Sequence, residues 1–363
     1  MKKTPKELAL EVISILNKRN QNIIKKRFGL IDGTNRTLES IGRDYGVTRE
    51  RIRQIVEASL ENLKKSSQIS LLRDFWRTAA KVLQKTNGVE TEKGFLEKLV
   101  SILGVSPGQI AAIKFLLCLS PEIKLEPETK QHKSFWRRKS LSPAHIANIV
   151  SKIEEYFQKQ KRVFRPEEMM KWAKQNISPK ITLAELEVYL LLSPKIGRNI
   201  FGEYGLLQWP EITPRGAKDR AYMMLKHYRK PLHFSKIAER INELRDTKAV
   251  VPTHHSWLKK IQVQTVHNEL IKDPRFVLIG RGIYALRDWG YQPGTVADVI
   301  KDVLKHAGRP LTAKAIIRQV KKKRLARDTT IILNLNNKKL FKKLPGHRYT
   351  LAHSASKPKV LEI

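Results

Sequence analysis

The chain has 363 residues, which predicts two to three domains at about 150 residues per domain. Lys and Arg number 71 against 34 Asp and Glu, so the formal net charge is +37. This charge favours a polyanionic partner such as nucleic acid and argues against a compact enzyme for neutral metabolites. Because 41% of the residues are hydrophobic, the chain can also form packed cores.

The single cysteine, Cys118, excludes an intramolecular disulfide framework and a cysteine-based zinc cluster. Glu7 and Glu11 fall where a signal peptide would need an apolar core. The most apolar stretch, Ala111 to Leu119, is shorter than the roughly 20 residues that cross a bilayer. We therefore expect a cytoplasmic protein with no membrane segment.

Residues 5 to 63 show a helical pattern. Apolar residues recur at helical spacing in four short runs, and Gly29, Gly33 and Gly46 fall between the runs. Glycine can take the positive φ that ends one helix before the next begins. The pattern predicts a small all-helical module with tight turns.

After residue 66 the sequence repeats. A proline ends a helical pattern three times, and a tryptophan follows each proline by 15 residues: Pro121 and Trp136, Pro194 and Trp209, Pro274 and Trp289. The second and third copies alternate apolar and polar residues around glycines in this interval, which is typical of a β-hairpin. Three helices closed by a two-stranded hairpin describe a winged helix. We expect the tryptophans to close each hairpin as core residues.

A fourth copy lacks the proline and the tryptophan but keeps Phe341 and Tyr349 eight residues apart, as Phe276 and Tyr284 are. The predicted fold class is therefore mainly α, with an N-terminal helix-turn-helix and tandem winged-helix units that carry small β-hairpin wings. The third unit has an extra loop, residues 246–260. The predicted boundaries are 1–65 for the helical module and 70–138, 143–210, 217–289 and 295–353 for the four units.

The segment RTLESIGRDYGVTRERIRQIVEASLENLKK resembles region 4 of the bacterial housekeeping sigma factors, the sigma-70 family. RFGLIDG, TLESIG and VTRERIRQI occur in the family's order and spacing, so the resemblance covers about residues 5–65; Ser40 replaces a more usual acidic residue. It implies a helix-turn-helix that recognises a −35-like promoter element, docking on RNA polymerase core through the β subunit flap, and a place in the bacterial cytosol and nucleoid. No segment resembles the family's core-binding and −10-melting regions, so promoter opening would need another chain.

One helix of this module carries the candidate base-reading residues. Thr48 precedes it as a hydroxyl N-cap, and Arg49, Glu50, Arg53 and Gln54 share one face. These side chains suit base edges in the major groove, because Arg pairs with guanine, Gln with adenine and Glu with cytosine, at about 1 to 3 kcal/mol of discrimination each. The alternative is an ordinary solvated charged face.

Other residues of the module are expected on the DNA backbone. Arg43 and Arg51 are candidate phosphate contacts, and so is Thr48 at the start of the reading helix. By resemblance to the sigma-70 family, Thr37 and Glu39 at the start of the preceding helix also touch the backbone.

The winged units differ in their third helices. Residues 109–119 and 182–192 are mostly apolar, which indicates buried or protein-facing helices. The third unit shows Gln262, Gln264 and Asn268 and resembles the HARE-HTH module, a winged helix found in the δ subunit of Gram-positive RNA polymerase, in some restriction systems and in chromatin proteins. The resemblance implies transcription machinery or DNA-linked chemistry as its setting.

The C-terminal unit is the most basic part of the chain. Residues 291–363 hold 17 Lys and Arg against 4 Asp and Glu, a net charge of +13. Salt-sensitive phosphate contacts are expected from Lys321, Lys322, Lys323, Arg324, Arg327, Lys342, Lys343 and Arg348, with Lys338 and Lys339 beside them. The alternative is a basic face that only keeps the protein soluble.

No pattern of catalytic residues stands out. His254, His255 and His267 lack a Cys or carboxylate at ligand spacing, and phosphate loops and nucleophile elbows are missing. We expect no enzyme activity, cofactor, metal or small-molecule substrate. The sequence predicts a transcription protein that binds double-stranded promoter-like DNA and recruits or modulates RNA polymerase. The alternatives are a δ-like polymerase accessory protein with a nonspecific nucleic-acid clamp, and the recognition subunit of a restriction or repair complex.

Overall fold

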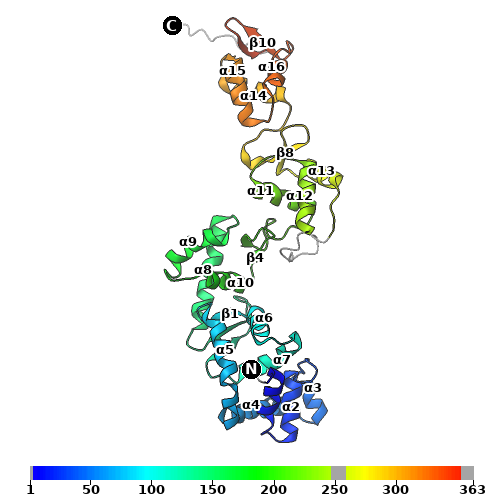
Figure 1. Ribbon diagram of the computed structural model, residues 1–363. Coiled ribbons are helices and arrows are strands. Elements are labelled where there is room, and N and C mark those ends of the chain that lie inside the picture. Colours follow the sequence, from blue (N-terminus) through cyan, green and yellow to red (C-terminus); the bar gives the residue numbers. More distant parts are fainter. Residues whose placement is uncertain (1–2, 247–258, 353–363) are drawn as a thin grey trace. The chain divides into compact units, whose positions relative to one another are not determined.

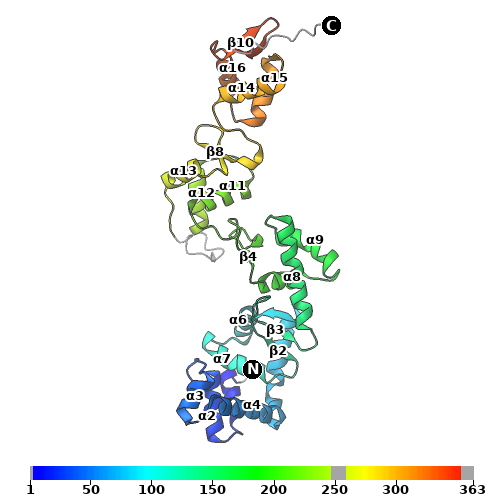
Figure 2. The ribbon, with the colours of Figure 1, turned by 180° about the vertical axis from the view of Figure 1, so that it is seen from behind.

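The computed structural model describes residues 3–246 and 259–352 of the chain (Figures 1 and 2). It is mainly helical with small antiparallel sheets, which confirms the predicted fold class. The chain divides into two compact units, Met1–Gly197 with Glu203–Leu206, and Arg198–Gly202 with Leu207–Ile363. Each unit is described by itself below.

Four helices form the N-terminal module, as predicted: α1 (Pro5–Ile13), α2 (Lys18–Phe28), α3 (Leu38–Tyr45) and α4 (Arg49–Lys65). Each begins after a polar residue whose side-chain oxygen accepts a backbone N–H of the first turn: Thr4, Asn17, Thr37 and Thr48. Gly29 and Gly46 end α2 and α3 in the left-handed region, at φ of 64° and 61°. Local capping and turn chemistry therefore fix where these helices start and stop.

The first winged unit has the order helix, strand, helix, helix, hairpin. Its elements are η1 (Ser67–Leu72), α5 (Arg73–Gln84), β1 (Val89–Thr91), α6 (Glu92–Leu103), η2 (Pro107–Gln109), α7 (Ile110–Cys118), β2 (Ile123–Glu126) and β3 (Phe135–Arg138). The antiparallel sheet has the order β1-β3-β2. Trp136 on the central strand β3 lies opposite Glu90 of β1 on one side and opposite Leu125 of β2 on the other.

The four helices and the first winged unit share one hydrophobic core. In both ribbon views α7 lies beside the N-terminal helices, and the rings of Phe28 and Phe115 meet edge to face with centroids 5.0 Å apart. Leu72 is fully buried in the same cluster, so the segment between the helical module and the first winged unit includes a short 3-10 helix packed on the core. One continuous hydrophobic core thus extends from α1 to β3.

The second winged unit consists of α8 (Pro143–Gln160), α9 (Pro166–Asn176), α10 (Leu183–Leu192), β4 (Ile196–Arg198) and β5 (Tyr204–Leu206). β4 pairs with β5, and Phe164 forms an isolated bridge to Tyr204. Five of the ten residues of α10 are buried hydrophobics, which matches its apolar sequence.

The third unit contains α11 (Ala217–Tyr228), β6 (Leu232–His233), α12 (Phe234–Asp246), α13 (Val263–Lys272), β7 (Phe276–Leu278), β8 (Ile283–Leu286) and η4 (Arg287–Trp289). The sheet order is β6-β8-β7, and the core includes Met224, Ile237 and Leu270. Most of the extra loop predicted at residues 246–260 lies outside the described residues, as do His254 and His255.

The fourth unit contains α14 (Val296–Ala307), β9 (Leu311–Thr312), α15 (Ala313–Lys323), α16 (Asp328–Leu335), β10 (Phe341–Leu344) and β11 (Arg348–Leu351). Its sheet order is β10-β11-β9, and Phe341 and Tyr349 are buried in a core of its own. The predicted hairpin around these two residues is confirmed.

Two details differ from the sequence-based expectations. The first, third and fourth sheets have a third strand, β1, β6 or β9, that a two-stranded hairpin did not include. Of the repeated tryptophans, Trp136 is a core residue at 1% exposure, whereas Trp209 and Trp289 are half-buried. They close their hairpins only partly, because each follows the last strand of its unit.

Candidate nucleic-acid interface

The N-terminal half of α4 presents a row of polar side chains to solvent. The Thr48 hydroxyl accepts the backbone N–H of Arg51 at 3.2 Å and fixes the first turn. Ile52 is fully buried and Val56 is 7% exposed, so they hold the opposite face in the core. The exposed side comprises Arg49, Glu50, Arg51, Arg53 and Gln54.

The turn between α3 and α4 sets the angle at which this row is offered. Gly46 takes φ of 61°, and the Val47 N–H donates to the Gly42 carbonyl at 2.9 Å. A Cβ on Gly42 would lie 2.6 Å from the Val47 carbonyl oxygen, which is too close for any side chain. Gly42 therefore allows the close approach of the turn to α3.

An ion-pair network links side chains on the exposed face of α4. Arg53 Nη2 donates to Glu50 Oε1 at 2.7 Å, and Arg53 Nη1 donates to Glu57 one turn further along. The hydrogen bond from Arg53 lowers the pKa of Glu50, and the two carboxylates raise the pKa of Arg53. The Gln54 amide also donates to Glu50, at 3.3 Å. Glu57 did not figure in the sequence-based set, although its i,i+4 spacing from Arg53 was a readable signal.

Arg49 differs from Arg53 in its contacts with carboxylates. Among residues 3–246 and 259–352 it makes no ion pair, and it stands at the first position of α4. Its guanidinium can therefore reach a base edge or phosphate without first breaking an internal contact, whereas Arg53 must exchange one.

The residues predicted on the DNA backbone from α3 are all exposed. The Thr37 hydroxyl accepts the Ser40 N–H at 3.1 Å and caps the helix, and Glu39 stands in the first turn. Arg43 lies in the last turn of the same helix. The free N–H groups and the positive dipole end of α3 would favour a phosphate there, whereas Glu39 would weaken that attraction.

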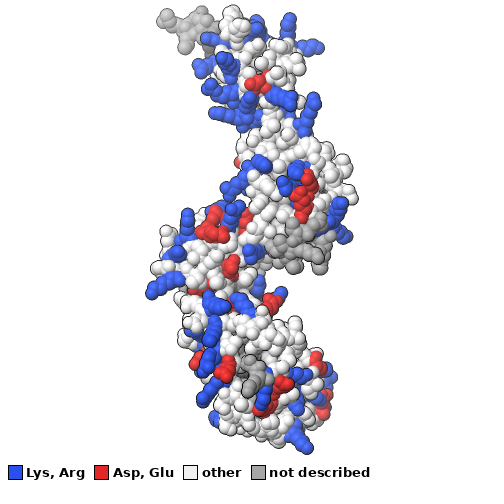
Figure 3. All heavy atoms as spheres, in the orientation of Figure 1, with Lys and Arg blue, Asp and Glu red and all other residues white. Residues whose placement is uncertain are grey.

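The C-terminal unit carries a second basic surface. Figure 3 shows Lys and Arg side chains gathered over the elements from α14 to β10. On the wing, Lys342 pairs in register with Thr350 and Leu344 with Arg348 across β10 and β11. The exposed predicted contacts are Lys321, Lys322, Arg327, Lys342, Lys343 and Arg348. Two cations are partly engaged, because Lys321 pairs with Asp328 and half-buried Lys323 pairs with Asp302 at 3.2 Å.

Arg324 does not belong to this surface. It is only 9% exposed, and its Nη1 donates to the Leu278 carbonyl at 2.9 Å. Burial lowers its pKa. The backbone turns into extended geometry at Arg324, where α15 ends, and this aims the side chain inward instead of along its lysine neighbours. The predicted phosphate contact at Arg324 is therefore wrong.

The third helices of the winged units offer little for base reading. α7 is largely buried in the core shared with α1. α13 exposes Gln264 and Asn268 and follows the exposed Gln262, and Gln264 donates to Asn268 at 2.9 Å. α16 exposes Thr329, Thr330 and Leu333 and no cation of its own. In the fourth unit the predicted phosphate contacts thus lie around the end of α15 and on the wing, and not on the third helix.

Within the described ranges, no group of three or more His, Cys, Asp or Glu side chains is arranged to hold a metal ion. No single helix there is both long and apolar enough to cross a bilayer; Glu92–Leu103 and Pro107–Cys118 satisfy the length and composition only as a pair, and they meet at a bend of 116°.

Comparison with known proteins gives one family match. The sigma-70, region 4 family model matches residues 12–65, which are α2, α3, α4 and the end of α1. The chain is 49% identical over 70 residues to the RNA polymerase sigma factor SigA of Listeria monocytogenes and to that of Listeria innocua, and 47% identical over 70 residues to SigA of a Bacillus species.

These matches cover 19% of this chain and 19% of each relative. The resemblance of the third winged unit to the HARE-HTH module stays a prediction. Within the matched segment, the capped α4, its exposed row of side chains and the tight turn after α3 are all present. Residues 12–65 of this mainly helical, winged-helix-like chain are therefore a sigma-70 region 4 domain.

Proposed function

We propose that this protein is a DNA-binding transcription protein that uses α4 to read a −35-like promoter element. The observation that carries the proposal is the exposed row on a capped helix, inside a domain of the sigma-70 region 4 family. Arg49, Glu50 and Gln54 read base edges, and Arg53 joins them once DNA replaces its internal carboxylate partners.

Contacts to phosphates position this reading head on the duplex. We assign these contacts to exposed residues at the start of each helix and on it: Thr37, Glu39 and Arg43 for α3, and Thr48 and Arg51 for α4. In the C-terminal unit, the exposed cations at the end of α15 and on the wing add a sequence-independent grip that weakens as salt rises.

The transcription role extends to RNA polymerase. The proposed action is recruitment or modulation of the core enzyme through the region 4 domain, with the β subunit flap as the docking partner. Part of the apolar surface of α1 and α2 is already covered by α7, so this contact would use the surface that α7 leaves open. The protein acts by binding, with no reaction of its own.

Selection of bound duplexes from a random pool by the full chain tests the reading role. The proposal expects one recurrent −35-like motif to be enriched. Enrichment without any common motif would overturn sequence recognition.

A second candidate rests on the basic wing: a polymerase accessory protein that clamps nucleic acid without reading it. Pull-down of polymerase from a lysate treated with nuclease separates the two. Polymerase retained after nuclease treatment supports direct docking, and polymerase lost indicates bridging by DNA.

A further inference from the structure

A groove runs along the first winged unit, on the side of α5 that faces the segment before β2. Three adjoining cavities of about 610, 630 and 350 Å³ form it, and Pro121 lines all three. The region 4 face described above plays no part in it, apart from Lys64 near the end of α4. Cavities of a few hundred Å³ are the size that holds ligands or the anchoring side chains of a partner.

The floor of the groove is apolar. Ile69, Leu119 and Ile123 line it together with Trp76 and Trp136. The Trp76 Nε1 donates to the Leu116 carbonyl at 2.9 Å, so the indole ring is held in place. Ile123 and Trp136 are almost completely buried, which makes the floor part of the shared core and therefore rigid. Such a floor can receive bulky apolar side chains with little rearrangement.

The rim of the groove is basic. Its cations come from four elements and surround a single acidic residue, Glu122; they are Lys64, Arg73, Arg77, Lys124, Arg138 and Lys139. Arg77 and Lys124 have carboxylate partners at 3.2 and 3.5 Å, but in the part of the chain that the structure describes Lys64, Arg73, Arg138 and Lys139 form no ion pair. The unpaired charges are left for a ligand of opposite sign.

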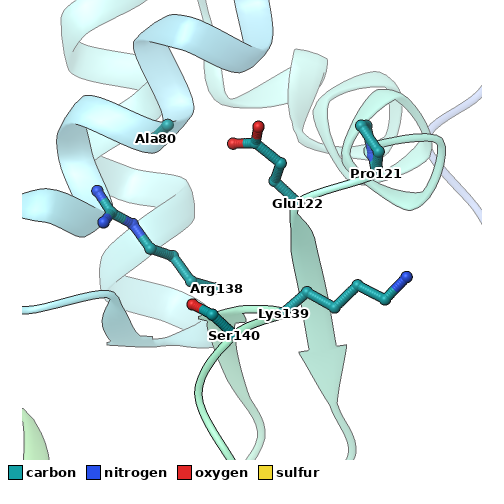
Figure 4. Close-up of a pocket in the computed structure, with 6 residues that line it drawn as sticks. All are labelled: Ala80, Pro121, Glu122, Arg138, Lys139 and Ser140. Carbon is teal, nitrogen blue, oxygen red and sulfur yellow. The ribbon is translucent and has the colours of Figure 1, made fainter.

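The close-up of one cavity shows how the rim is built (Figure 4). Arg138 and Glu122 point into the space below Ala80 of α5, and Lys139 extends in the other direction. Lys139 also lines the neighbouring cavity. Lys139 thus lines two of the three cavities. Positive charge lies along the groove on both sides of Glu122.

We propose that this groove binds an acidic segment of a partner protein that carries bulky apolar side chains. The apolar side chains would fill the floor around Trp76, and the carboxylates would meet Lys64, Arg73, Arg138 and Lys139. The basic rim favours a partner segment with negative charge, and the apolar floor favours one with apolar side chains.

Single-stranded nucleic acid fits this groove less well. Strand-binding grooves stack successive bases on exposed aromatic rings, but Trp136 is only 1% exposed and leaves Trp76 as the one accessible ring lining these cavities. Glu122 would also repel a phosphate chain that ran the length of the groove. Lys64 lies about 22 Å along α4 from Arg49, so duplex DNA at the reading end would leave the groove free.

Cys118 supplies a local probe for this proposal. It is the single cysteine of the chain, it is exposed, and it lines the groove next to Leu119. The rate at which a maleimide alkylates the full chain therefore reports on this surface alone. The test ligand is a short peptide of Glu, Leu and Phe; the comparison ligands are the same peptide with Ser in place of Leu and Phe, and oligothymidine.

We expect the Glu, Leu and Phe peptide to bind and to slow alkylation of Cys118, and the serine peptide to do neither. The double variant Lys64→Glu, Lys139→Glu should bind the peptide about tenfold more weakly at physiological salt. The matched control Lys152→Glu, Lys159→Glu changes two exposed lysines of α8 away from the groove, and its affinity should stay within about twofold of the wild type.

Two results would overturn the proposal. One is protection of Cys118 by oligothymidine but not by the apolar acidic peptide, which would make the groove a nucleic-acid site. The other is peptide binding that leaves the alkylation rate unchanged or weakens equally in both double variants, which would place the peptide elsewhere on this basic protein. Circular dichroism of each variant checks that the fold is kept.

Discussion

Helix α4 of the N-terminal module and helix α16 of the C-terminal unit are similar in how they pack but differ in the side chains that they expose. Both pack one face on a core and expose the other. α4 exposes arginine, glutamate and glutamine on successive turns, whereas α16 exposes Thr329, Thr330 and Leu333, and Leu333 is 71% exposed. The cations that we expect on DNA in the C-terminal unit lie instead around the end of α15 and on the wing. Side chains on a helix can reach base edges in the major groove, but a wing mainly meets phosphates. The proposed base-reading residues and the proposed phosphate contacts of the C-terminal unit therefore lie in different parts of the chain.

The two regions also differ in how they are supported. Helix α4, the proposed reading helix, belongs to a core that continues through α7 and β3, but the C-terminal unit packs around its own small cluster. A reading head needs fixed geometry, which a larger core supplies, whereas phosphate contacts tolerate small displacements. The following changes test this contrast, from the largest expected effect to the smallest.

Phe115→Ala should destabilise α1 and α2 together with α7. The ring is fully buried against Phe28, and its loss should cost about 3 to 5 kcal/mol of unfolding free energy. Hydrogen exchange should show faster exchange in all three helices. In the control Phe341→Ala, the C-terminal unit should lose protection and α1 should not. Unchanged protection of α2 in Phe115→Ala would contradict the shared core.

Arg49→Ala should weaken binding to the selected site by about 1 to 3 kcal/mol and leave most nonspecific binding intact. The reason is that Arg49 makes no ion pair within the described part of the chain and is placed at the first position of α4. Titration of the selected and a scrambled duplex at one salt concentration measures it. An equal loss on both duplexes would remove Arg49 from base reading.

The triple variant Lys342→Ala, Lys343→Ala, Arg348→Ala should weaken binding to every duplex alike. If all three cations meet phosphates, the slope of log affinity against log salt should fall by about 2 to 3, because each contact contributes about 0.9. Alanine at the buried position Arg324 should leave that slope unchanged. If the slope does not change in the triple variant, the three cations of the wing do not contact phosphates and only keep the protein soluble.

Glu57→Gln should tighten DNA binding slightly, by about twofold or less, because it frees Arg53 from one of its two carboxylates. The control is Glu61→Gln, which removes one charge from the next turn of α4 without touching Arg53. A gain in Glu57→Gln that exceeds the gain in the control assigns the effect to Arg53. Equal gains would show only the change in net charge.

The N-terminal helices could be predicted well because their signals are local. Thr37 and Thr48 cap helices three residues before their bonded N–H groups, and Gly46 needs the left-handed region. The strands β6 and β9 have two residues each, too few for any alternation to show, so they were missed. The isolated β-bridge between Phe164 and Tyr204 could not be predicted for the same reason.

The rest depends on contacts between distant residues. The pairing of Phe28 with Phe115 joins two modules that looked separate in the sequence. Arg324 has the same composition around it as Lys322, and only the end of α15 turns it inward. The link between Arg53 and Glu57 was within reach of the i,i+4 rule, whereas the groove along α5 combines residues from 64 to 139 and has no local signature.

We propose that α4 reads base edges and that the wing contacts phosphates. One ratio tests this division most directly: the affinity for the selected duplex divided by the affinity for a scrambled duplex. It should be measured at the same salt for the wild type, Arg49→Ala and the wing triple variant. The account predicts that Arg49→Ala lowers the ratio about fivefold or more, while the wing variant lowers both affinities and keeps the ratio. A ratio that falls in the wing variant and holds in Arg49→Ala would contradict it.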